Sequence, residues 1–482
     1  MIKKTNRTVF AIGIILFLFN IITKLFFLDM RDIANDEPFS IFHSQKSISE
    51  ILDLMKDENN PPLHFIFLHF WIKLFGIEPF AVRLPSVIFS SLAAVLIFST
   101  GKRFFNIQTG VFAALIFSLS AMHLSFSHEA RVYPMFVLLT SASLYYFLSA
   151  INDHTKRKNY FFLLTLNCLL IYSHYFGWFV IFMEFVCIFF ISAKKRMYKP
   201  MSVIFIILFA SYLPIVFIFI HRFSVSVNQG TWVQPPHFNE VYGNLNRFIN
   251  SKYCMLVLIV IFLVGVISQL KTRSAFQMIK SFFQNDNAKV IFLCFISSYL
   301  TMFIAAYKVP MFIDRYILFI TVPFYLLIAI TVQQLFSKNN LLLYSAISVF
   351  VACLAYTLNL NPDNNRRLNE TANEVKKLKK QDTPVLICPY YADLGFIYYY
   401  NREYFKDYKK MYSLLEKEKI FSVSNNMQVN AIIADSKECI YVQADSWYID
   451  PENLIFKNLE SKFKKHELKE IFEIYKVHYF FK

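Results

Sequence analysis

The sequence predicts a polytopic α-helical membrane protein with about eleven transmembrane spans and a small α/β domain at its C-terminal end. Hydrophobic residues make up 56% of the 482 residues, 56 of them are phenylalanine, and only 17% are charged. A water-soluble core cannot hold so many apolar side chains. Apolar runs of about 16 to 22 residues also recur through the first three quarters of the chain, and this length crosses the ~30 Å of hydrocarbon in a bilayer.

The apolar runs give the expected positions of the spans. The first run follows Lys3 and Lys4 as in a secretory signal, but it is long and no small-residue cleavage site follows it, so we interpret it as an uncleaved first helix. Another run holds Glu184 in its middle, where a carboxyl group needs a partner or a proton, and we expect it to have a structural role or to support site residues. The expected spans are 8–28, 84–101, 107–126, 132–151, 160–176, 178–193, 201–221, 253–270, 290–306, 316–335 and 341–359.

The basic residues of the connecting segments predict the orientation. If the N-terminus is cytoplasmic, the inner connections carry 17 Lys and Arg and 2 acidic residues. The outer segments of 29–360 carry 11 Lys and Arg and 12 acidic residues. Because cytoplasmic loops are enriched in Lys and Arg, this asymmetry predicts a cytoplasmic N-terminus and an outer C-terminal domain. It also explains the net charge of +16, which therefore does not indicate nucleic-acid binding. The inner connections are 1–7, 101–106, 152–159, 194–200, 271–289 and 336–340.

One apolar stretch, 61–76, does not fit as a span. Counting it would place every later basic loop on the wrong side of the membrane. It also contains His64, His69 and Lys73, so we expect a helix that lies in or dips into the outer interface. Residues 29–83 then form one large outer loop within a membrane domain that covers residues 1–360.

The composition becomes mixed after residue 360, which predicts a small outer α/β domain over 361–482. The chain has seven cysteines, and none is spaced as in a metal or redox motif. Two of them, Cys388 and Cys439, fall in this domain, and an oxidising compartment would permit them to pair. The expected strands are 383–388, 431–435 and 440–443, and a helix is expected over 369–380.

The first outer loop contains two groups of candidate site residues. Asp36 and Glu37 are adjacent carboxylates just beyond the first span. They could bind a metal, act as a base or simply be solvated. Asn60 precedes Pro61 and Pro62 at the start of the interfacial helix, where it could bind a ligand or only cap that helix.

Two further outer turns carry polar residues at membrane depth. His128, Glu129 and Arg131 lie between the third and fourth spans, and such a cluster is costly there unless it is paired or functional. Mutual neutralisation of Glu129 and Arg131 is the structural alternative. His174 and Tyr175 lie between the fifth and sixth spans, where they could serve a site or only the aromatic belt at the headgroups.

Arg315 and Tyr316 open the tenth span. Arginine at the lip of the bilayer can bind a ligand phosphate or extend to a lipid phosphate. The predicted topology places these candidates on one membrane face, which suits a site where arginines grip an anionic group and a carboxylate remains as a base. The residues that converge there are Asp36, Asn60, His128, Arg131, His174 and Arg315.

The order of these motifs resembles the GT-C membrane glycosyltransferases, specifically the group of the protein O-mannosyltransferases and the aminoarabinose lipid A transferases. The resemblance covers about residues 8–360, and the ordered set is far more specific than any single motif. Its members are Asp36-Glu37, Asn60-Pro61-Pro62-Leu63, Leu74-Phe75-Gly76, Arg83-Leu84-Pro85-Ser86, Ser127-His128-Glu129-Ala130-Arg131, His174-Tyr175, the loop 232–236 that begins with Trp232, and Arg315-Tyr316.

The resemblance implies a GT-C fold, a polyprenyl-phosphate sugar donor and an Asp36 base that takes the proton of an acceptor hydroxyl, with inversion. Many relatives have His or Lys at the position of Asn60, so Arg131 and Arg315 should carry more of the phosphate binding. The aminoarabinose enzymes have an acidic residue at the position of Asn59, and its loss predicts that no metal or other cofactor is required. Expected substrate-binding residues are Glu37, Asn60, His128, Arg131, His174, Tyr175, Arg315 and Tyr316.

The loop 222–252 is too short for the large lumenal insertion of the eukaryotic mannosyltransferases, so we expect a multi-pass protein of a bacterial inner (plasma) membrane. The expected partners are the sugar donor, a glycan, lipid or protein acceptor and membrane lipids, without nucleic acid. A flippase or transporter of lipid-linked saccharides is the alternative function. It would show internal repeats and polar sites at mid-membrane depth. The sequence shows no repeat, and its candidate polar residues cluster at one membrane face. A scaffold protein would leave the ordered motifs unexplained.

Overall fold

The computed structural model describes residues 2–482 except 55, 57–59, 230–232, 271–273, 362, 445–448 and 472–473. Two motif positions, Asn59 and Trp232, thus lie outside the described residues. The chain forms two compact units. We call them the bundle unit, which comprises Met1–Phe26, Leu52–His64 and Arg83–Leu360, and the sheet unit, which comprises Phe27–Ile51, Phe65–Val82 and Asn361–Lys482.

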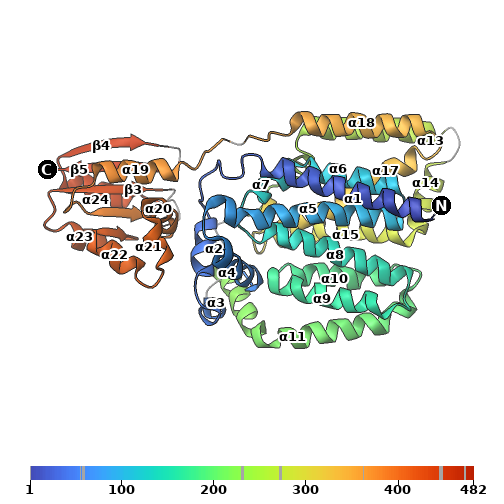
Figure 1. Ribbon diagram of the computed structural model, residues 1–482, viewed down its shortest axis with the longest axis horizontal. Coiled ribbons are helices and arrows are strands. Elements are labelled where there is room, and N and C mark those ends of the chain that lie inside the picture. Colours follow the sequence, from blue (N-terminus) through green and yellow to red (C-terminus); the bar gives the residue numbers. More distant parts are fainter. Residues whose placement is uncertain are drawn as a thin grey trace. The chain divides into compact units, whose positions relative to one another are not determined.

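The bundle unit is helical, and each of the eleven predicted spans overlaps a helix (Figure 1). Its helices are α1 (Ile2–Leu25), α5 (Pro79–Phe104), α6 (Ile107–Ser118), α7 (Ala121–Ser127), α8 (Tyr133–Asn152), α9 (Arg157–Ser173), α10 (Gly177–Ile188), α11 (Lys194–Gln229), α12 (Glu240–Phe248), α13 (Lys252–Leu270), α14 (Ala275–Gln284), α15 (Asp286–Ala305), α16 (Asp314–Ile317), the 3₁₀ turn η1 (Leu318–Ile320), α17 (Thr321–Leu335) and α18 (Asn340–Thr357).

Fewer of these helices are long enough to span than the sequence predicts. Among the described residues, eight helices are long and apolar enough to cross a membrane, and a ninth span results if α6 and α7, bent by 60°, are counted as one. The other two predicted spans correspond to α9, with 17 residues, and α10, with 12. Both are short because the chain turns at His174 and again after Ile188. The predicted class, a multi-span helical membrane protein, is confirmed.

Close packing and buried polar contacts hold the bundle together. A methyl group on Gly101 would lie 2.6 Å from the Cα atom of Gly110, so the ends of α5 and α6 approach as only glycines allow. The Ser143 hydroxyl donates to the Glu184 carboxylate over 2.6 Å, and the Asn167 amide donates to it over 2.9 Å. These contacts tie α8, α9 and α10 and give Glu184 the partners that a buried carboxyl group needs.

The sheet unit is built on five strands in the order β2-β1-β3-β5-β4. Strand β1 is parallel to β2 and β3, whereas β5 is antiparallel to both of its neighbours. The remaining elements are helical (Figure 1). The elements are α2 (Glu37–Ser44), α3 (Ile48–Leu54), α4 (Leu63–Phe75), α19 (Leu368–Leu378), β1 (Val385–Cys388), η2 (Tyr390–Ala392), α20 (Asp393–Tyr400), α21 (Arg402–Lys406), α22 (Met411–Lys417), β2 (Ile420–Ser422), α23 (Asn426–Ile433), β3 (Glu438–Gln443), α24 (Leu454–Lys462), β4 (Lys465–Glu470) and β5 (Lys476–Phe481).

The predicted strands 383–388 and 440–443 correspond to β1 and β3, but the predicted strand 431–435 is wrong. That stretch ends helix α23, because the Asn425 side chain caps the helix by accepting from the Gln428 amide and because Val429 and Ile433 bury one face at a helical spacing. Strand β4 escaped the sequence analysis because all of its residues are exposed and no apolar alternation marks it.

Cys388 and Cys439 do not pair. Both are buried free thiols. In the parallel register Val385 faces Ile440 and Cys388 faces Gln443, so Cys439 lies beside the opposite end of β1 from Cys388. Four residues of strand separate the two positions, or about 13 Å, which is too far for a disulfide.

Much of the predicted outer loop folds with the C-terminal segment inside the sheet unit. The backbone carbonyl of Asp32 accepts a hydrogen bond from Arg366 over 3.2 Å, and the Asp32 carboxylate accepts from the Asn369 amide over 2.8 Å. The amide of Ile33 donates to the Tyr399 hydroxyl over 2.6 Å. A helix is present where one was expected, as α4, with 13 residues. The conformation of this loop is therefore set by residues more than 300 positions later.

A buried carboxyl group predicts how the stability of the sheet unit depends on pH. Burial raises the pKa of Asp393 to about 6, although Ser422 and Tyr412 donate hydrogen bonds to its carboxylate. The folded-state pKa lies above the unfolded value of about 3.9. The contribution of Asp393 to the free energy of unfolding is therefore fully present below pH ~4 and is lost as the pH rises through 6, a change of roughly 3 kcal/mol.

The measurement is hydrogen exchange of the β1 and β2 amides in the full-length protein, corrected for the intrinsic rates. In wild type, protection should fall between pH 4 and pH 8. In Asp393→Asn, which keeps the side-chain shape but cannot ionise, protection should be nearly constant over that range. An equal fall in both proteins would show that another group controls the stability.

Candidate functional site

The turn before α2 presents Asp36. Asn35 adopts a left-handed backbone conformation with φ of 55°, which asparagine tolerates better than most residues. Asp36 then occupies the N-cap position of α2, but its side chain does not cap the helix. It is half-buried. The backbone of the turn therefore places Asp36 at the start of α2, and its carboxylate is not used to satisfy the helix end.

Glu37 lies in a different environment from its neighbour. Its side chain is only 2% exposed, and its carboxylate forms an ion pair with the Arg366 guanidinium over 2.6 Å. The same Arg366 nitrogen donates to the Asp32 carbonyl. A buried carboxylate with a dedicated cation is a poor base, so the contact favours a positioning role for Glu37 over the expected direct contact with substrate.

The turn between α7 and α8 is held from two sides within the bundle unit. The ring Nε2 atom of His128 lies 2.9 Å from the Lys24 carbonyl of α1. The Ser86 hydroxyl of α5 donates to the Glu129 carbonyl over 2.6 Å. These contacts link two of the sequence motifs, 83–86 and 127–131, and fix the backbone from which Arg131 projects.

Two arginines from distant parts of the bundle unit converge on His174. The Arg131 guanidinium, in the α7–α8 turn, lies 5.9 Å from the centroid of the Tyr133 ring, and that centroid lies 6.2 Å from the centroid of His174. The charges of Arg131 and of Arg315, in α16, both act on the imidazole of His174, which is 5% exposed. The ring centroids of His174 and Tyr316 lie 6.0 Å apart, and the Arg315 guanidinium lies 5.5 Å from the centroid of Tyr316. The backbone N–H of Phe176 donates to Nδ1 of His174 over 3.2 Å, which leaves Nε2 as the ring atom that can face a ligand.

The remaining candidates are less tightly grouped. The ring of Tyr175 packs against Phe219 of α11, with centroids 5.2 Å apart. Asn60 is half-buried, and the two prolines after it, Pro61 and Pro62, are buried at the start of α4. The structure therefore brings Arg131, His174, Arg315 and Tyr316 together.

Lys24 and Arg366 were missed by the sequence analysis. Lys24, fully buried in α1, donates to the Asn20 amide oxygen over 2.6 Å and lies 5.0 Å from the centroid of Phe117. A lysine inside an apolar run could have marked it as functional. Arg366 carries no such signal, because its partner Glu37 is 329 positions away. Within the described part of the chain, no group of three His, Cys, Asp or Glu side chains could hold a metal ion.

The fold resembles that of known GT-C membrane glycosyltransferases. Residues 59–218 match the family model described as dolichyl-phosphate-mannose-protein mannosyltransferase. The solved structure of ArnT from Cupriavidus metallidurans in the apo state matches with a TM-score of 0.61 and 11% identity, and the match covers 97% of each chain. The same protein bound to undecaprenyl phosphate gives a TM-score of 0.60, with the same identity and coverage.

The apo oligosaccharyltransferase from Archaeoglobus fulgidus matches with a TM-score of 0.52 and 11% identity, over 90% of this chain and 69% of that one. A search of curated proteins finds no match. The resemblance to the GT-C membrane glycosyltransferases, in the group that includes ArnT and the protein mannosyltransferases, is confirmed by the family model and the fold.

Proposed function

We propose that this protein is a glycosyltransferase that moves a sugar from a polyprenyl-phosphate donor to an acceptor hydroxyl on the outer face of the membrane, with inversion. The observation that carries the proposal is that Arg131 and Arg315 each lie over a tyrosine ring, Tyr133 and Tyr316, whose centroids lie 6.2 Å and 6.0 Å from that of His174. Two guanidinium groups at one place suit a phosphate. Related folds support the carrier, since ArnT has been solved with undecaprenyl phosphate and the archaeal oligosaccharyltransferase AglB with dolichol phosphate.

The proposed chemistry needs one base and no general acid. A polyprenyl phosphate leaves as an anion, and the arginines stabilise the charge that develops on it. Asp36 would accept the proton of the acceptor hydroxyl as that oxygen attacks the anomeric carbon from the face opposite the phosphate. We assign this role to Asp36 because Glu37 is committed to Arg366.

The other candidates would bind and orient substrate. His174 can donate from Nε2 to a phosphate or sugar oxygen, since Nδ1 already accepts from the backbone. Tyr316 supports Arg315 through the face of its ring. We propose supporting substrate contacts for Asn60, His128 and Tyr175, and no requirement for a metal.

The test is release of polyprenyl phosphate by the purified protein in nanodiscs, with polyprenyl-phosphate sugars as donors. Arg315→Ala should weaken donor binding by about 10- to 100-fold, because a charge-assisted contact to phosphate is worth about 1.5–3 kcal/mol. Arg103→Ala is the matched control, since Arg103 also lies over an aromatic ring, 5.1 Å from the centroid of Tyr145. Equal donor affinity for Arg315→Ala and wild type would remove Arg315 from the phosphate site.

The proposed orientation, with the N-terminus in the cytoplasm of a bacterial cell, is tested by labelling. Single cysteines replacing Lys56, beside the undescribed Asp57, and Glu78 in a cysteine-free variant should both react with an impermeant reagent added outside. A cysteine replacing Lys195 should react only after permeabilisation. Labelling of position 56 without position 78 would contradict the assignment of α4 to the outer side.

A further inference from the structure

A cavity of about 700 Å³ lies at one end of the bundle unit, where three helix connections meet. The end of α8, the α10–α11 connection and the α14–α15 connection form its walls. Arg131 precedes the first residue of α8 and the cavity lies at its last, 20 residues on, so about 30 Å of helix separates the cavity from the proposed donor site. Side chains that line it include Asn152, Lys194, Lys195, Arg196, Gln284 and Asn287.

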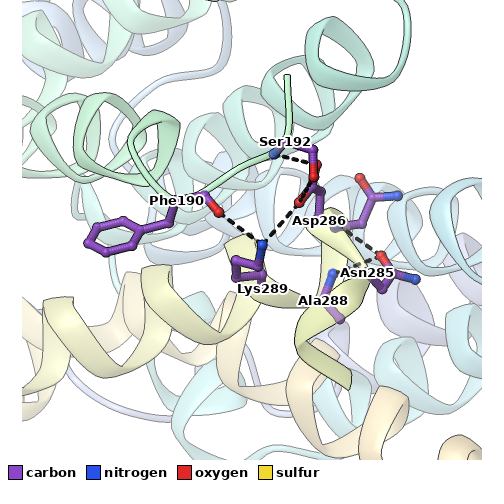
Figure 2. A network of polar contacts seen from close by, with 7 residues as sticks. Phe190, Ser192, Asn285, Asp286, Ala288 and Lys289 are labelled. Atoms are coloured by element: carbon purple, nitrogen blue, oxygen red, sulfur yellow. Dashed lines mark hydrogen bonds and ion pairs between the residues drawn. The ribbon is translucent and has the colours of Figure 1, made fainter. Parts of the chain in front are cut away.

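A hydrogen-bonded frame fixes the walls of the cavity (Figure 2). The Asp286 carboxylate accepts from the backbone N–H of Ser192 over 2.8 Å and from its hydroxyl over 3.2 Å. Lys289 forms an ion pair with Asp286 over 3.1 Å and donates to the Phe190 carbonyl over 2.9 Å. The α10–α11 and α14–α15 connections are thereby tied together, and the negative charge of Asp286 is balanced within the frame.

The charge left over at the cavity is positive. Lys194, Lys195 and Arg196 are exposed, and none of the three takes part in an ion pair among the residues that the structure describes. The only acidic residue in the cavity lining is Asp286. The second acidic residue of the inner connections, Asp153, forms an ion pair with Lys156 over 2.5 Å. Three cations therefore face an opening with no carboxylate left to neutralise them, which suits a phosphate-bearing ligand.

The surroundings of the cavity indicate a lipid as the source of that phosphate. Phe189 and Phe190, which precede the lining residues 192–196 by two residues or more, are 50% and 55% exposed, and Tyr198 just after them is 37% exposed. Exposed phenylalanine rings suit contact with acyl chains, and tyrosine is enriched at the level of the headgroups. Basic pockets between membrane helices on the cytoplasmic side suit anionic headgroups.

We propose that this cavity binds the headgroup of an anionic phospholipid from the leaflet that the basic connections assign to the cytoplasm. Lys194, Lys195 and Arg196 hold the phosphate, and the exposed Phe189 and Phe190 contact its acyl chains. This site lies at the opposite end of α8 from the proposed donor site, so it stands whether or not the proposed transferase activity is correct.

The experiment measures lipid binding to the detergent-solubilised full-length protein by native mass spectrometry, with phosphatidylglycerol and phosphatidylcholine as probes. The test variant is Lys194→Gln/Lys195→Gln/Arg196→Gln. Its matched control is Lys156→Gln/Arg157→Gln/Lys158→Gln. This variant also removes two lysines and one arginine, but from the α8–α9 connection, whose residues 156–158 do not line the cavity. The test variant should bind phosphatidylglycerol about 100-fold more weakly, because each basic residue near a lipid surface contributes about 1 kcal/mol and three are removed. The control should bind it like wild type.

A similar loss of phosphatidylglycerol affinity in both triple variants would show that the lipid is attracted by overall charge, and would overturn the site. Unchanged affinity in both variants would overturn it as well. Equal wild-type affinity for the two phospholipids would also overturn it. Inorganic phosphate that bound wild type as tightly as phosphatidylglycerol would assign the cavity to a soluble phosphate instead of a lipid. If the triple variant does not elute as a single folded species, Arg196→Gln and Arg157→Gln replace the pair, with an expected loss of about 5-fold for the first only.

Discussion

Asp36→Asn is expected to lower turnover by at least ~100-fold and to leave donor binding largely intact. Asparagine keeps the shape and most of the hydrogen bonding of aspartate but cannot accept the proton of the attacking hydroxyl, and general-base catalysis contributes about 10²–10⁴-fold. The half-buried carboxylate does not cap α2, so the substitution should not cost the helix its cap. Turnover is measured as release of polyprenyl phosphate, and donor affinity is measured separately.

Glu37→Gln is the matched control for the neighbouring carboxylate. Because Glu37 is ion-paired with Arg366, its loss should appear as reduced stability and not as a specific loss of proton transfer. Unchanged release by Asp36→Asn, in a preparation where wild type is active, would refute Asp36 as the base and shift the assignment to Glu37. A protein that moves lipid-linked saccharides across the bilayer without any release would support the transporter alternative.

Arg366→Ala is expected to destabilise the sheet unit by about 3–5 kcal/mol, the cost of leaving a buried charge without its partner. The guanidinium holds both the Glu37 carboxylate and the Asp32 carbonyl. Its removal should therefore loosen the turn that carries Asp36 and lower turnover as well. Hydrogen exchange of the α2 and α19 amides in the full-length protein reports the change.

Arg367→Ala is the matched control. Arg367 pairs with the exposed Glu370, and the two side chains are 41% and 52% exposed. It also donates to the Ile471 carbonyl over 2.6 Å, a hydrogen bond worth about 0.5–1.5 kcal/mol. An exposed ion pair is worth about 0–1 kcal/mol. The double variant Glu37→Gln/Arg366→Ala should recover part of the stability, since no uncompensated carboxylate remains. Equal effects of Arg366→Ala and Arg367→Ala would show that the Glu37–Arg366 pair does not hold the loop.

The sequence by itself determined the class of this protein and the identity of most candidate residues. The apolar runs predicted where the helices of the bundle unit lie, because the partition of a segment into hydrocarbon depends on its own composition and length. The order of the motifs from Asp36 to Tyr316 predicted the GT-C resemblance. Composition did not resolve where a helix ends early, as α10 does at Ile188, or that the apolar stretch 431–435 completes a capped helix.

Tertiary structure alone decided which of these residues meet. The sequence did not indicate that residues 27–51 fold with the C-terminal segment, or that Arg366 neutralises Glu37. It also could not place Arg131 and Arg315, 184 positions apart in the printed sequence, at the same imidazole. Hydropathy and charge predict whether a segment lies in water or in lipid. These contacts depend instead on which surfaces face one another after the chain has folded, and no local sequence pattern specifies those surfaces.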